Sequence, residues 1–365
     1  MQHLDEEELT RFVAERVANA ATGQGLTPEK IAPPHLSPPA SRRRAAVHAA
    51  SLAGRIALGF REGGSHNLVD LAECPVLVPE LAAMVAPLRK LLARHAQGDS
   101  TGPAKSQGKG KGRHKGPDKS SRRIAADIEL AVVEQGVDIA ITGLTVEGLG
   151  ATEAMLDFAR DHGLARLTLD QGYGPEALWE PEPVTVSLAG ISVGYPPGAF
   201  LQATADGEAV LVAAAREWLA GANTVADLFA GLGTFSFALA GPTKVLAVEA
   251  ARDTHMACKA AAGRNGLPIH AMHRDLFRNP LQTDELDRFD AVLLDPPRAG
   301  ARDQVALIAQ SSVPRVVYIS CNPSSWARDA VTLVEGGYRL VELRPVGQFR
   351  WSTHVELASL FVRGS

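Results

Sequence analysis

The most constraining feature of the chain is a regular alternation of strand-like and helix-like segments from about Asp206 to the C-terminus. The strand-like segments are almost unbroken apolar runs, which is typical of strands buried on both faces of a sheet. They are TVADLFA, KVLAVEA, FDAVLLDPP and RVVYIS, and GEAVLVAAAREWLAG, TFSFALAG and RDQVALIAQ have helical character. This pattern predicts an α/β fold with a doubly wound parallel sheet, which binds ligands beyond the carboxyl ends of its strands.

The preceding part of the chain has a less regular pattern and predicts a separate mixed α/β domain. RRAAVHAA and GRIALGF are strand-like, PELAAMVAPLRKLLARH and TEAMLDFARDHG are helical, and IELAVVEQGVDIAITG predicts a hairpin that turns near Gly136. PVTVSLAGISVGYPP predicts another strand pair. The predicted domains are an N-terminal helical remnant at 1–34, the mixed domain at 35–205 and the α/β domain at 206–365.

A Lys/Gly-rich insertion at 97–123 interrupts the mixed domain. From Lys105 to Arg123 it contains one acid, Asp118, against many Lys and Arg residues, and it lacks aliphatic and aromatic side chains. Such a segment cannot form a core, so we expect it to be disordered. It is either a solvated linker or a flexible arm that contacts phosphates.

The composition places the chain among cytoplasmic globular proteins. No stretch approaches the roughly 18 uninterrupted apolar residues of a membrane span, and the N-terminus is acidic, unlike a signal peptide. We therefore expect no membrane partner, and we expect a monomer. The three cysteines, Cys74, Cys258 and Cys321, are far apart and odd in number, which favours free thiols.

The first strand end of the α/β domain carries a glycine loop, ADLFAGLGTF. Gly231 and Gly233 allow the backbone to pass close to a ligand, but the third glycine of a dinucleotide fingerprint is replaced by Ser236. Glu249 ends the next strand and could accept hydrogen bonds from ribose hydroxyls, and Asp275 could do so from an adenine amino group. Either acid could instead cap a helix. Together with the loop they favour an adenosyl cofactor.

Two later strand ends carry reactive or constrained groups. In LLDPPRAG the two prolines hold a rigid loop with Asp295 at the sheet edge, and Arg298 projects from it toward a possible phosphate. In VVYISCNPSS the strand stops at Cys321, and the Asn-Pro pair turns the chain away. We expect these two strands to be neighbours, so that Asp295 and Cys321 face one pocket.

The motifs DLFAGLGTF, LDPPRAGA, YISCNPSSWARD and FRWSTHVE together resemble those of the bacterial RNA uracil-5-methyltransferases, which use S-adenosylmethionine. The resemblance extends upstream through FLQAT and GFREGGSHNLVDLAECPVL. It implies a Rossmann-like class I methyltransferase domain preceded by a mixed α/β RNA-binding domain. It also implies an RNA substrate, with 23S ribosomal RNA favoured and transfer RNA as the alternative.

The resemblance implies a role for each matching position. Cys321 matches the nucleophile that adds to carbon 6 of uracil, and Glu356 matches the base that removes the proton from carbon 5 after methyl transfer. The site should then favour the Cys321 thiolate. Asp295 and Arg298 would help to hold a flipped uridine. The positions that match cofactor contacts are Gln202, Phe229, Thr234, Glu249, Asp275 and Asp295.

The sequence departs from the family at several places. Thr204 and Thr234 stand where the family has Asn, and GQFR at Gly347 to Arg350 lacks the Asp and Pro of the usual Asp-x-Phe-Pro. Cys74 resembles the fourth ligand of an iron-sulfur cluster, but the other three are missing, so we expect no cluster in this chain. Many members of the family also carry an N-terminal β-barrel RNA-binding domain, which this sequence lacks. The absence of the barrel and of the other cluster cysteines reflects either a natural loss or a start placed too late.

Two other functions stay open at this point. An acid-Pro-Pro loop also suits methylation of an adenine amino group, which needs no nucleophilic cysteine. A non-catalytic RNA-binding factor could use the same scaffold, because fold alone does not determine function.

Overall fold

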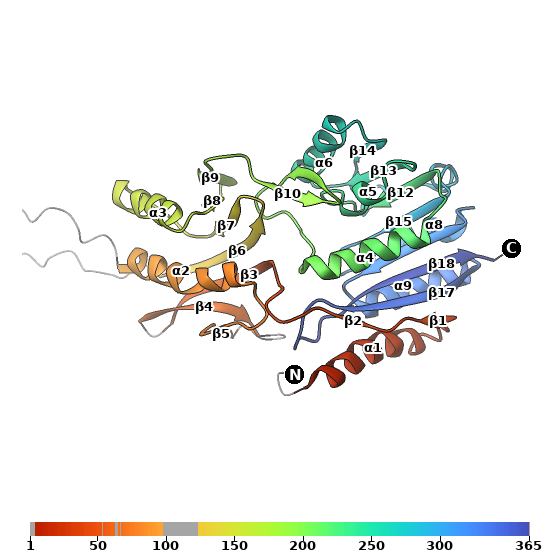
Figure 1. Ribbon diagram of the computed structural model, residues 1–365, viewed down its shortest axis with the longest axis horizontal. Helices are drawn as coiled ribbons and strands as arrows, with labels where there is room; N and C mark the ends of the chain where they lie inside the picture. The colour runs from red at the N-terminus through yellow and green to blue at the C-terminus, as the bar shows by residue number, and fades with distance from the viewer. Residues whose placement is uncertain (1–3, 53, 63–64, 66, 98–122, 365) are drawn as a thin grey trace, which may run out of the picture. The chain divides into compact units, whose positions relative to one another are not determined.

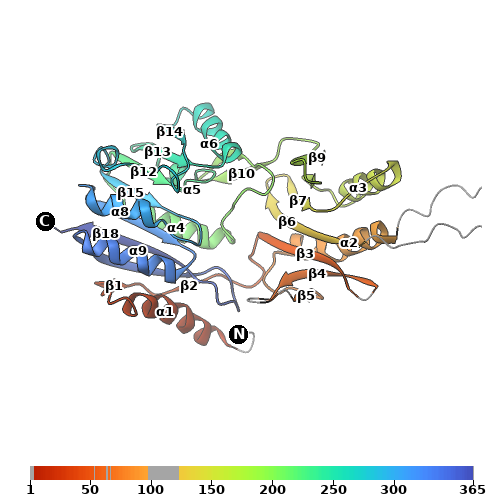
Figure 2. The ribbon, with the colours of Figure 1, turned by 180° about the vertical axis from the view of Figure 1, so that it is seen from behind.

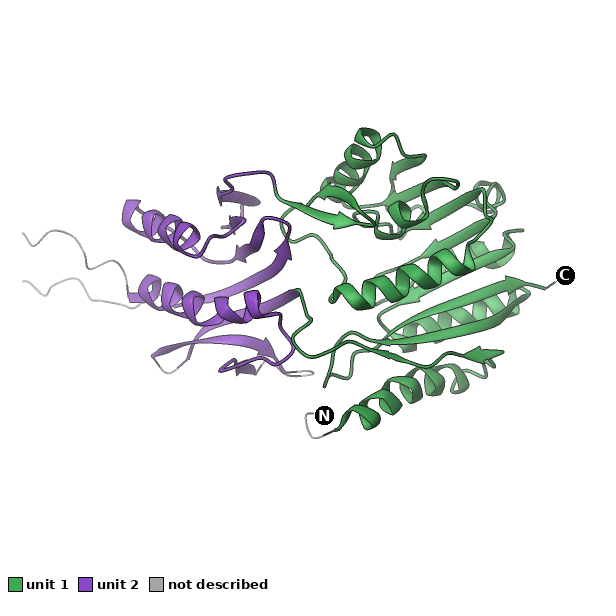
Figure 3. Ribbon diagram, in the orientation of Figure 1, with its two compact units in different colours: residues 1–43, 184–365 green, residues 44–183 purple. Residues whose placement is uncertain are grey.

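A computed structural model describes residues 4–52, 54–62, 65, 67–97 and 123–364 (Figure 1, with the reverse view in Figure 2). The chain forms two compact units, one of residues 1–43 and 184–365 and the other of residues 44–183 (Figure 3). Apart from its first and last residues, the predicted insertion at 97–123 lies outside the described residues. The domain boundaries drawn from the sequence, at 34/35 and 205/206, stay a prediction.

The first unit is built on a nine-stranded sheet in the order β1-β17-β18-β16-β15-β12-β13-β14, with β2 also paired to β17. Strands β12 to β16 run parallel, while β18 is antiparallel to both β16 and β17. The strand order reverses at β12, which lies between β13 and β15. The strands are β1 (Lys30–Ile31), β2 (His35–Leu36), β12 (Thr224–Leu228), β13 (Lys244–Glu249), β14 (Ile269–His273), β15 (Ala291–Leu294), β16 (Arg315–Ser320), β17 (Tyr338–Gly347) and β18 (Glu356–Arg363).

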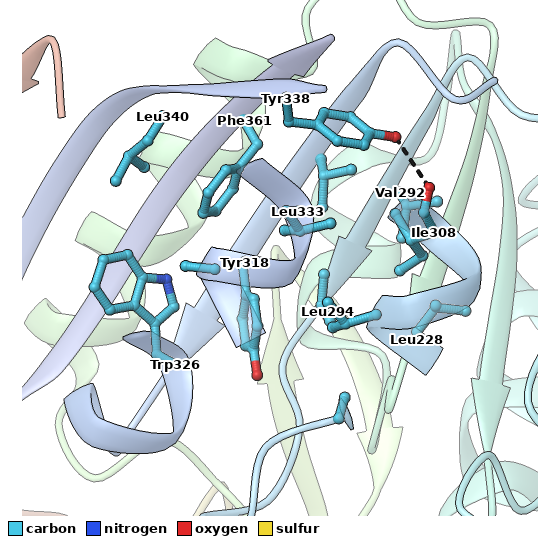
Figure 4. Close-up of a cluster of buried hydrophobic side chains, with 14 of the residues drawn as sticks. Leu228, Val292, Leu294, Ile308, Tyr318, Trp326, Leu333, Tyr338, Leu340 and Phe361 are labelled. Carbon is cyan, nitrogen blue, oxygen red and sulfur yellow. Dashed lines mark hydrogen bonds between the residues drawn. The ribbon is translucent and has the colours of Figure 1, made fainter. Parts of the chain in front are cut away.

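Helices cover both faces of this sheet, as the sequence predicts. Along β16, Val316 and Tyr318 belong to the core with α1, α8 and α9, whereas Val317 and Ile319 pack with α4 and α5. Figure 4 shows the first of these cores, where the Tyr338 hydroxyl donates to the Ile308 carbonyl at 3.4 Å. The helices are α1 (Glu6–Thr22), α4 (Ala205–Trp218), α5 (Thr234–Leu239), α6 (Arg252–Arg264), α7 (Thr283–Leu286), α8 (Arg302–Gln310) and α9 (Pro323–Glu335).

The predicted strand pair in PVTVSLAGISVGYPP is the antiparallel hairpin β10 (Thr185–Leu188) and β11 (Ile191–Gly194), which belongs to the first unit. Residues of the N-terminal segment are also integral to this unit. Val13 and Val17 of α1 are buried in the same core as Trp326, and β1 and β2 extend the sheet.

The second unit has a seven-stranded sheet in the order β5-β4-β3-β6-β7-β8-β9. The predicted hairpin at Gly136 is confirmed as β6 and β7, and α2 and α3 share one buried cluster with the sheet. Its elements are β3 (Arg44–Leu52), β4 (Arg55–Arg61), β5 (Leu68–Asp70), α2 (Pro79–Gln97), β6 (Ala125–Val133), β7 (Gly136–Thr142), α3 (Leu149–Asp161), β8 (Arg166–Asp170) and β9 (Pro175–Trp179). The α/β fold class is therefore confirmed. Within the described residues no helix is long and apolar enough to cross a membrane.

Candidate active site

A cavity of about 410 Å³ opens at the carboxyl ends of the parallel strands of the first unit. It lies where the strand order reverses, which is where doubly wound sheets bind their ligands. All but one of the site residues predicted in this unit line it: Gln202, Phe229, Gly231, Thr234, Glu249, Asp275, Asp295, Arg298, Cys321 and Glu356. The exception is Gly233, which is buried and precedes α5.

The glycine loop after β12 has a backbone that few residue types tolerate. Gly231 and Gly233 have φ values of 56° and 95°, and Phe229 adopts the same left-handed region with φ 62°. A Cβ atom at Gly233 would lie 2.9 Å from the Cys258 sulfur, so a side chain cannot fit there. The Gly231 N–H donates to Glu249 at 2.9 Å, which fixes the loop against the end of β13.

Glu249 and Asp275 both bond to nearby backbone, but neither caps a helix: α6 begins without a side-chain cap, and residues 276–278 after Asp275 form a turn. Glu249 Oε1 accepts from the Ala251 N–H at 2.6 Å, and Asp275 Oδ1 accepts from the Phe277 N–H at 2.9 Å. A carboxylate has about four acceptor positions, so these bonds leave capacity for a ligand in the cavity. Bonding to the backbone and binding of a ligand are therefore compatible.

Cys321 follows β16 directly, and β16 pairs with β15 in parallel, as expected from the sequence. The Asn-Pro pair begins a helix and does not form a loop. Asn322 caps α9 by accepting from the Ser324 N–H at 3.2 Å, and the proline occupies the first turn, where its missing N–H costs little. Asn322 Nδ2 and Ser325 Oγ also donate to the Arg298 carbonyl, at 2.9 and 3.0 Å, and these bonds hold the Cys321 turn to the Asp295 loop.

The acids around Cys321 are held toward their neutral forms. Burial raises the pKa of Glu356, which is 4% exposed, to about 7, while the Arg298 charge opposes the rise. Burial, together with Glu356, raises the pKa of Asp295 well above its ordinary value. Burial and the negative charges of Glu356 and Asp295 raise the pKa of Cys321 to about 11. The expectation that the site favours the thiolate is therefore wrong for these protein groups alone.

Two residues of the site escaped the sequence analysis. His354 Nδ1 lies 3.2 Å from the Arg298 guanidinium, and only its place two residues before Glu356 could have indicated it. Gln348 bonds to Gln202 at 3.1 Å, although its segment differs from the family pattern. Both contribute polar contacts to the groups that line the cavity.

Neither of the other two cysteines lines this cavity. Cys74 packs against the core of the second unit, and among the described residues there is no group of three or more His, Cys, Asp or Glu side chains that could hold a metal ion. Cys258 is 1% exposed, and burial raises its pKa to about 12, which agrees with the packing role predicted for it.

A family model and related sequences both match this chain, and their descriptions agree. A family model described as tRNA (Uracil-5-)-methyltransferase matches residues 192–363. An uncharacterized RNA methyltransferase of Zymomonas mobilis subsp. mobilis is 43% identical over 363 residues, which cover 100% of this chain and 85% of that protein. The 23S rRNA (uracil(1939)-C(5))-methyltransferase RlmD of Edwardsiella ictaluri is 32% identical over 354 residues, covering 95% of this chain and 74% of that protein.

A solved structure supports the fold. The crystal structure of Pyrococcus abyssi tRNA (uracil-54, C5)-methyltransferase in complex with S-adenosyl-L-homocysteine matches with a TM-score of 0.70 and 20% identity, covering 99% of this chain and 84% of that one. The Rossmann-like fold and the resemblance seen in the motifs are therefore confirmed. The chain belongs to the RNA uracil-5-methyltransferase family.

Proposed function

We propose that the protein transfers a methyl group from S-adenosylmethionine to carbon 5 of a uridine in 23S ribosomal RNA, through a covalent bond between Cys321 and carbon 6. The observation that carries this proposal is that Cys321, Glu356 and the Asp295 loop line the same cavity as the glycine loop. An adenine-amino methyltransferase would have no use for a thiol beside a buried carboxylate.

The residues of the cavity fit an adenosyl cofactor. Glu249 ends β13 and Asp275 follows the neighbouring β14, and the two acids suit ribose hydroxyls and an adenine amino group. Phe229 and Phe277 line the same cavity with ring centroids 5.4 Å apart, and they supply apolar surface for a purine. When bound, S-adenosylmethionine supplies the methyl group and a positive sulfonium, which favours anionic neighbours.

The chemistry assigned to the protein groups follows from their surroundings. The Cys321 thiol must first lose its proton to solvent, after which the thiolate adds to carbon 6 and the displaced π-electron pair makes carbon 5 nucleophilic. Carbon 5 would take the methyl group as its bond to the sulfonium breaks, which would leave neutral S-adenosylhomocysteine, and Glu356 then removes the remaining proton from carbon 5. The released electron pair re-forms the double bond and expels the thiolate. A base with a pKa of about 7 is well matched to this step near neutral pH.

The cavity mouth supports a nucleic-acid substrate. Arg298 lines the cavity and is exposed, and the exposed His354 contacts it. The Phe349 ring lies 5.9 Å from the His354 ring, and the Arg42 guanidinium lies 5.1 Å from the centre of the Phe349 ring. Cations beside an aromatic ring suit phosphates and an unstacked base. The identity with RlmD favours 23S rRNA, while the description of the matching family model keeps tRNA as the alternative. We also propose that the protein acts as a monomer in the cytoplasm.

The proposal is tested by incubating the protein with labelled S-adenosylmethionine and, separately, 23S rRNA and tRNA, followed by mapping of the methylated base. We expect 5-methyluridine in 23S rRNA and none with the Cys321→Ala variant. RNA that contains 5-fluorouridine should give a covalent adduct at Cys321, because fluorine cannot leave carbon 5 as a proton does. Methylation that survives Cys321→Ala would refute the covalent mechanism. The absence of both methyl transfer and adduct on bulk RNA would instead support a non-catalytic RNA-binding factor.

A further inference from the structure

A chain of hydrogen bonds runs through the first unit from a backbone amide to the Asp295 carboxyl group. The Thr204 N–H donates to Gln348 Oε1 at 3.2 Å, and Gln348 Nε2 donates to Gln202 Oε1 at 3.1 Å. Gln202 Nε2 in turn donates to Asp295 Oδ2 at 3.2 Å. Gln348 and Gln202 are 2% and 3% exposed, so water does not compete for these bonds.

The Thr204 N–H fixes the direction in which this series of hydrogen bonds runs. A backbone N–H can only donate, so Gln348 must turn its oxygen toward Thr204 and its NH₂ group toward Gln202. Gln202 must then accept with its oxygen and direct its own NH₂ group to Asp295. The orientation of both amides follows from the one donor that cannot rotate.

Gln348 packs closely against the start of α4, where the absence of a side chain at Gly207 makes room for it. A Cβ atom on Gly207, in the first turn of α4, would lie 2.5 Å from Gln348 Cγ and 2.7 Å from Cδ. Thr204 is itself anchored, because its hydroxyl contacts Ser37 Oγ at 2.9 Å and accepts from the Gly207 N–H at 3.1 Å. Gln348 is therefore held at both ends.

We propose that Gln348 is a positioning residue for the active site: it fixes the amide of Gln202 so that Gln202 donates to Asp295 Oδ2. Asp295 Oδ1 takes no part in these bonds, which leaves it as an acceptor for a ligand in the cavity that Asp295 lines. The GQFR segment thus supplies a polar support in place of the missing Asp-x-Phe-Pro. The importance of this support for methyl transfer rests on the proposed function, but the hydrogen-bond chain can be tested without activity.

The test uses the rate at which iodoacetamide alkylates Cys321, measured by peptide mass spectrometry. The Gln202 hydrogen bond lowers the pKa of Asp295, and the negative charge of Asp295 raises that of Cys321. In Gln348→Met, Gln202 loses its fixed orientation, Asp295 becomes more often neutral, and the Cys321 thiolate is less strongly opposed. We expect alkylation of Cys321 to become about three-fold faster at a fixed pH, since the hydrogen bond is a neutral-to-carboxyl contact of ordinary strength.

Two controls separate positioning from general loosening of the fold. Cys258 is buried in the same unit, so its alkylation rate should stay unchanged in Gln348→Met. Gln304 is the matched control, because it is 1% exposed and its Oε1 likewise accepts from a backbone N–H, that of Leu281 at 2.8 Å, away from the cavity. Gln304→Met should leave Cys321 alkylation at the wild-type rate.

A second variant allows the same test if Gln348→Met folds poorly. Gln348→Glu retains the acceptor for Thr204 but cannot donate when ionised, so Gln202 must turn its NH₂ group away from Asp295. Faster Cys321 alkylation is expected again, although an added negative charge by itself would slow it. If both variants react at the wild-type rate, or if Cys321 and Cys258 accelerate together, Gln348 has no positioning role.

The activity measurement separates this inference from the proposed function. If the wild-type protein methylates RNA, Gln348→Met should lower kcat about ten-fold at saturating substrates, and Gln304→Met should not. If the wild-type protein does not methylate RNA, the proposed function fails while the alkylation result still decides the role of Gln348.

Discussion

Replacing the buried carboxyl group of Glu356 by an amide should stabilise the protein at alkaline pH. The side chain is 4% exposed, and burial raises its pKa from 4.5 to about 7. Below pH 4.5 the Glu356 carboxyl group is protonated in both the folded and the unfolded chain, so its ionisation does not lower the free energy of unfolding. Between pH 4.5 and about 7 this group is ionised in the unfolded chain but still protonated in the folded one. The free energy of unfolding therefore falls as the pH rises through this range. The difference between the two pKa values corresponds to about 3 kcal/mol, at about 1.4 kcal/mol per pKa unit.

The measurement is urea unfolding of the wild type and Glu356→Gln at a series of pH values from 4.5 to 8.5. Glu356→Gln cannot ionise, so its free energy of unfolding should exceed that of the wild type by about 3 kcal/mol more at pH 8 than at pH 4.5. Glu335 at the end of α9 is exposed, and Glu335→Gln should change the free energy of unfolding by less than about 0.5 kcal/mol at each pH. A difference between wild type and Glu356→Gln that does not vary with pH would refute the reasoning. Methyl transfer should be lost in the same variant, because the amide cannot accept the proton.

Three further substitutions test a loop, a helix cap and a buried ion pair. Gly300→Ala should destabilise the protein by about 2 kcal/mol in urea unfolding, because Gly300 has φ 81° and a Cβ atom would lie 2.5 Å from Asp329 Oδ2. Asn322→Ala removes the cap of α9 and should lower the melting temperature through a loss of about 1 kcal/mol. Arg166→Met leaves the 3%-exposed Asp138 without its partner and should cost about 3 kcal/mol, while the double variant with Asp138→Leu should recover most of that loss.

The sequence predicts the parallel part of the first sheet because each buried strand produces a local apolar run. The N-terminal strands are different. β1 and β2 have two residues each, too short to give any periodicity, and Lys30 of β1 bonds to Glu342, 312 residues away. The inclusion of residues 1–43 in the first unit is therefore a result of tertiary pairing. Local patterns do not carry that information.

The candidate site was predictable for a related reason. Residues that follow parallel strands meet at one edge of the sheet, so motifs far apart in sequence point to one place. The charge state of these residues was not predictable, because it depends on burial and on which charges lie close together. Gln348 was also hidden: its segment lacks the family pattern, and its partners Thr204 and Gln202 come from another part of the chain.

The charges of the site explain how buried carboxyl groups and a reactive Cys321 thiol can lie side by side. Asp227, Asp295 and Glu356 all have raised pKa values, and Cys321 lies beside the last two, while Arg298 is the cation that opposes the rise at Glu356 and Cys321. Because these raised pKa values leave a large part of each carboxyl group protonated near neutral pH, the protein avoids burying several full negative charges close together. A thiolate at Cys321 then requires either loss of a neighbouring negative charge or the arrival of a positive one. On the proposed function that positive charge is the sulfonium of the methyl donor.

We therefore expect wild-type Cys321 to be alkylated faster in the presence of sinefungin, a positively charged analogue of the cofactor, than in the presence of neutral S-adenosylhomocysteine. Equal rates with the two compounds would contradict this electrostatic account.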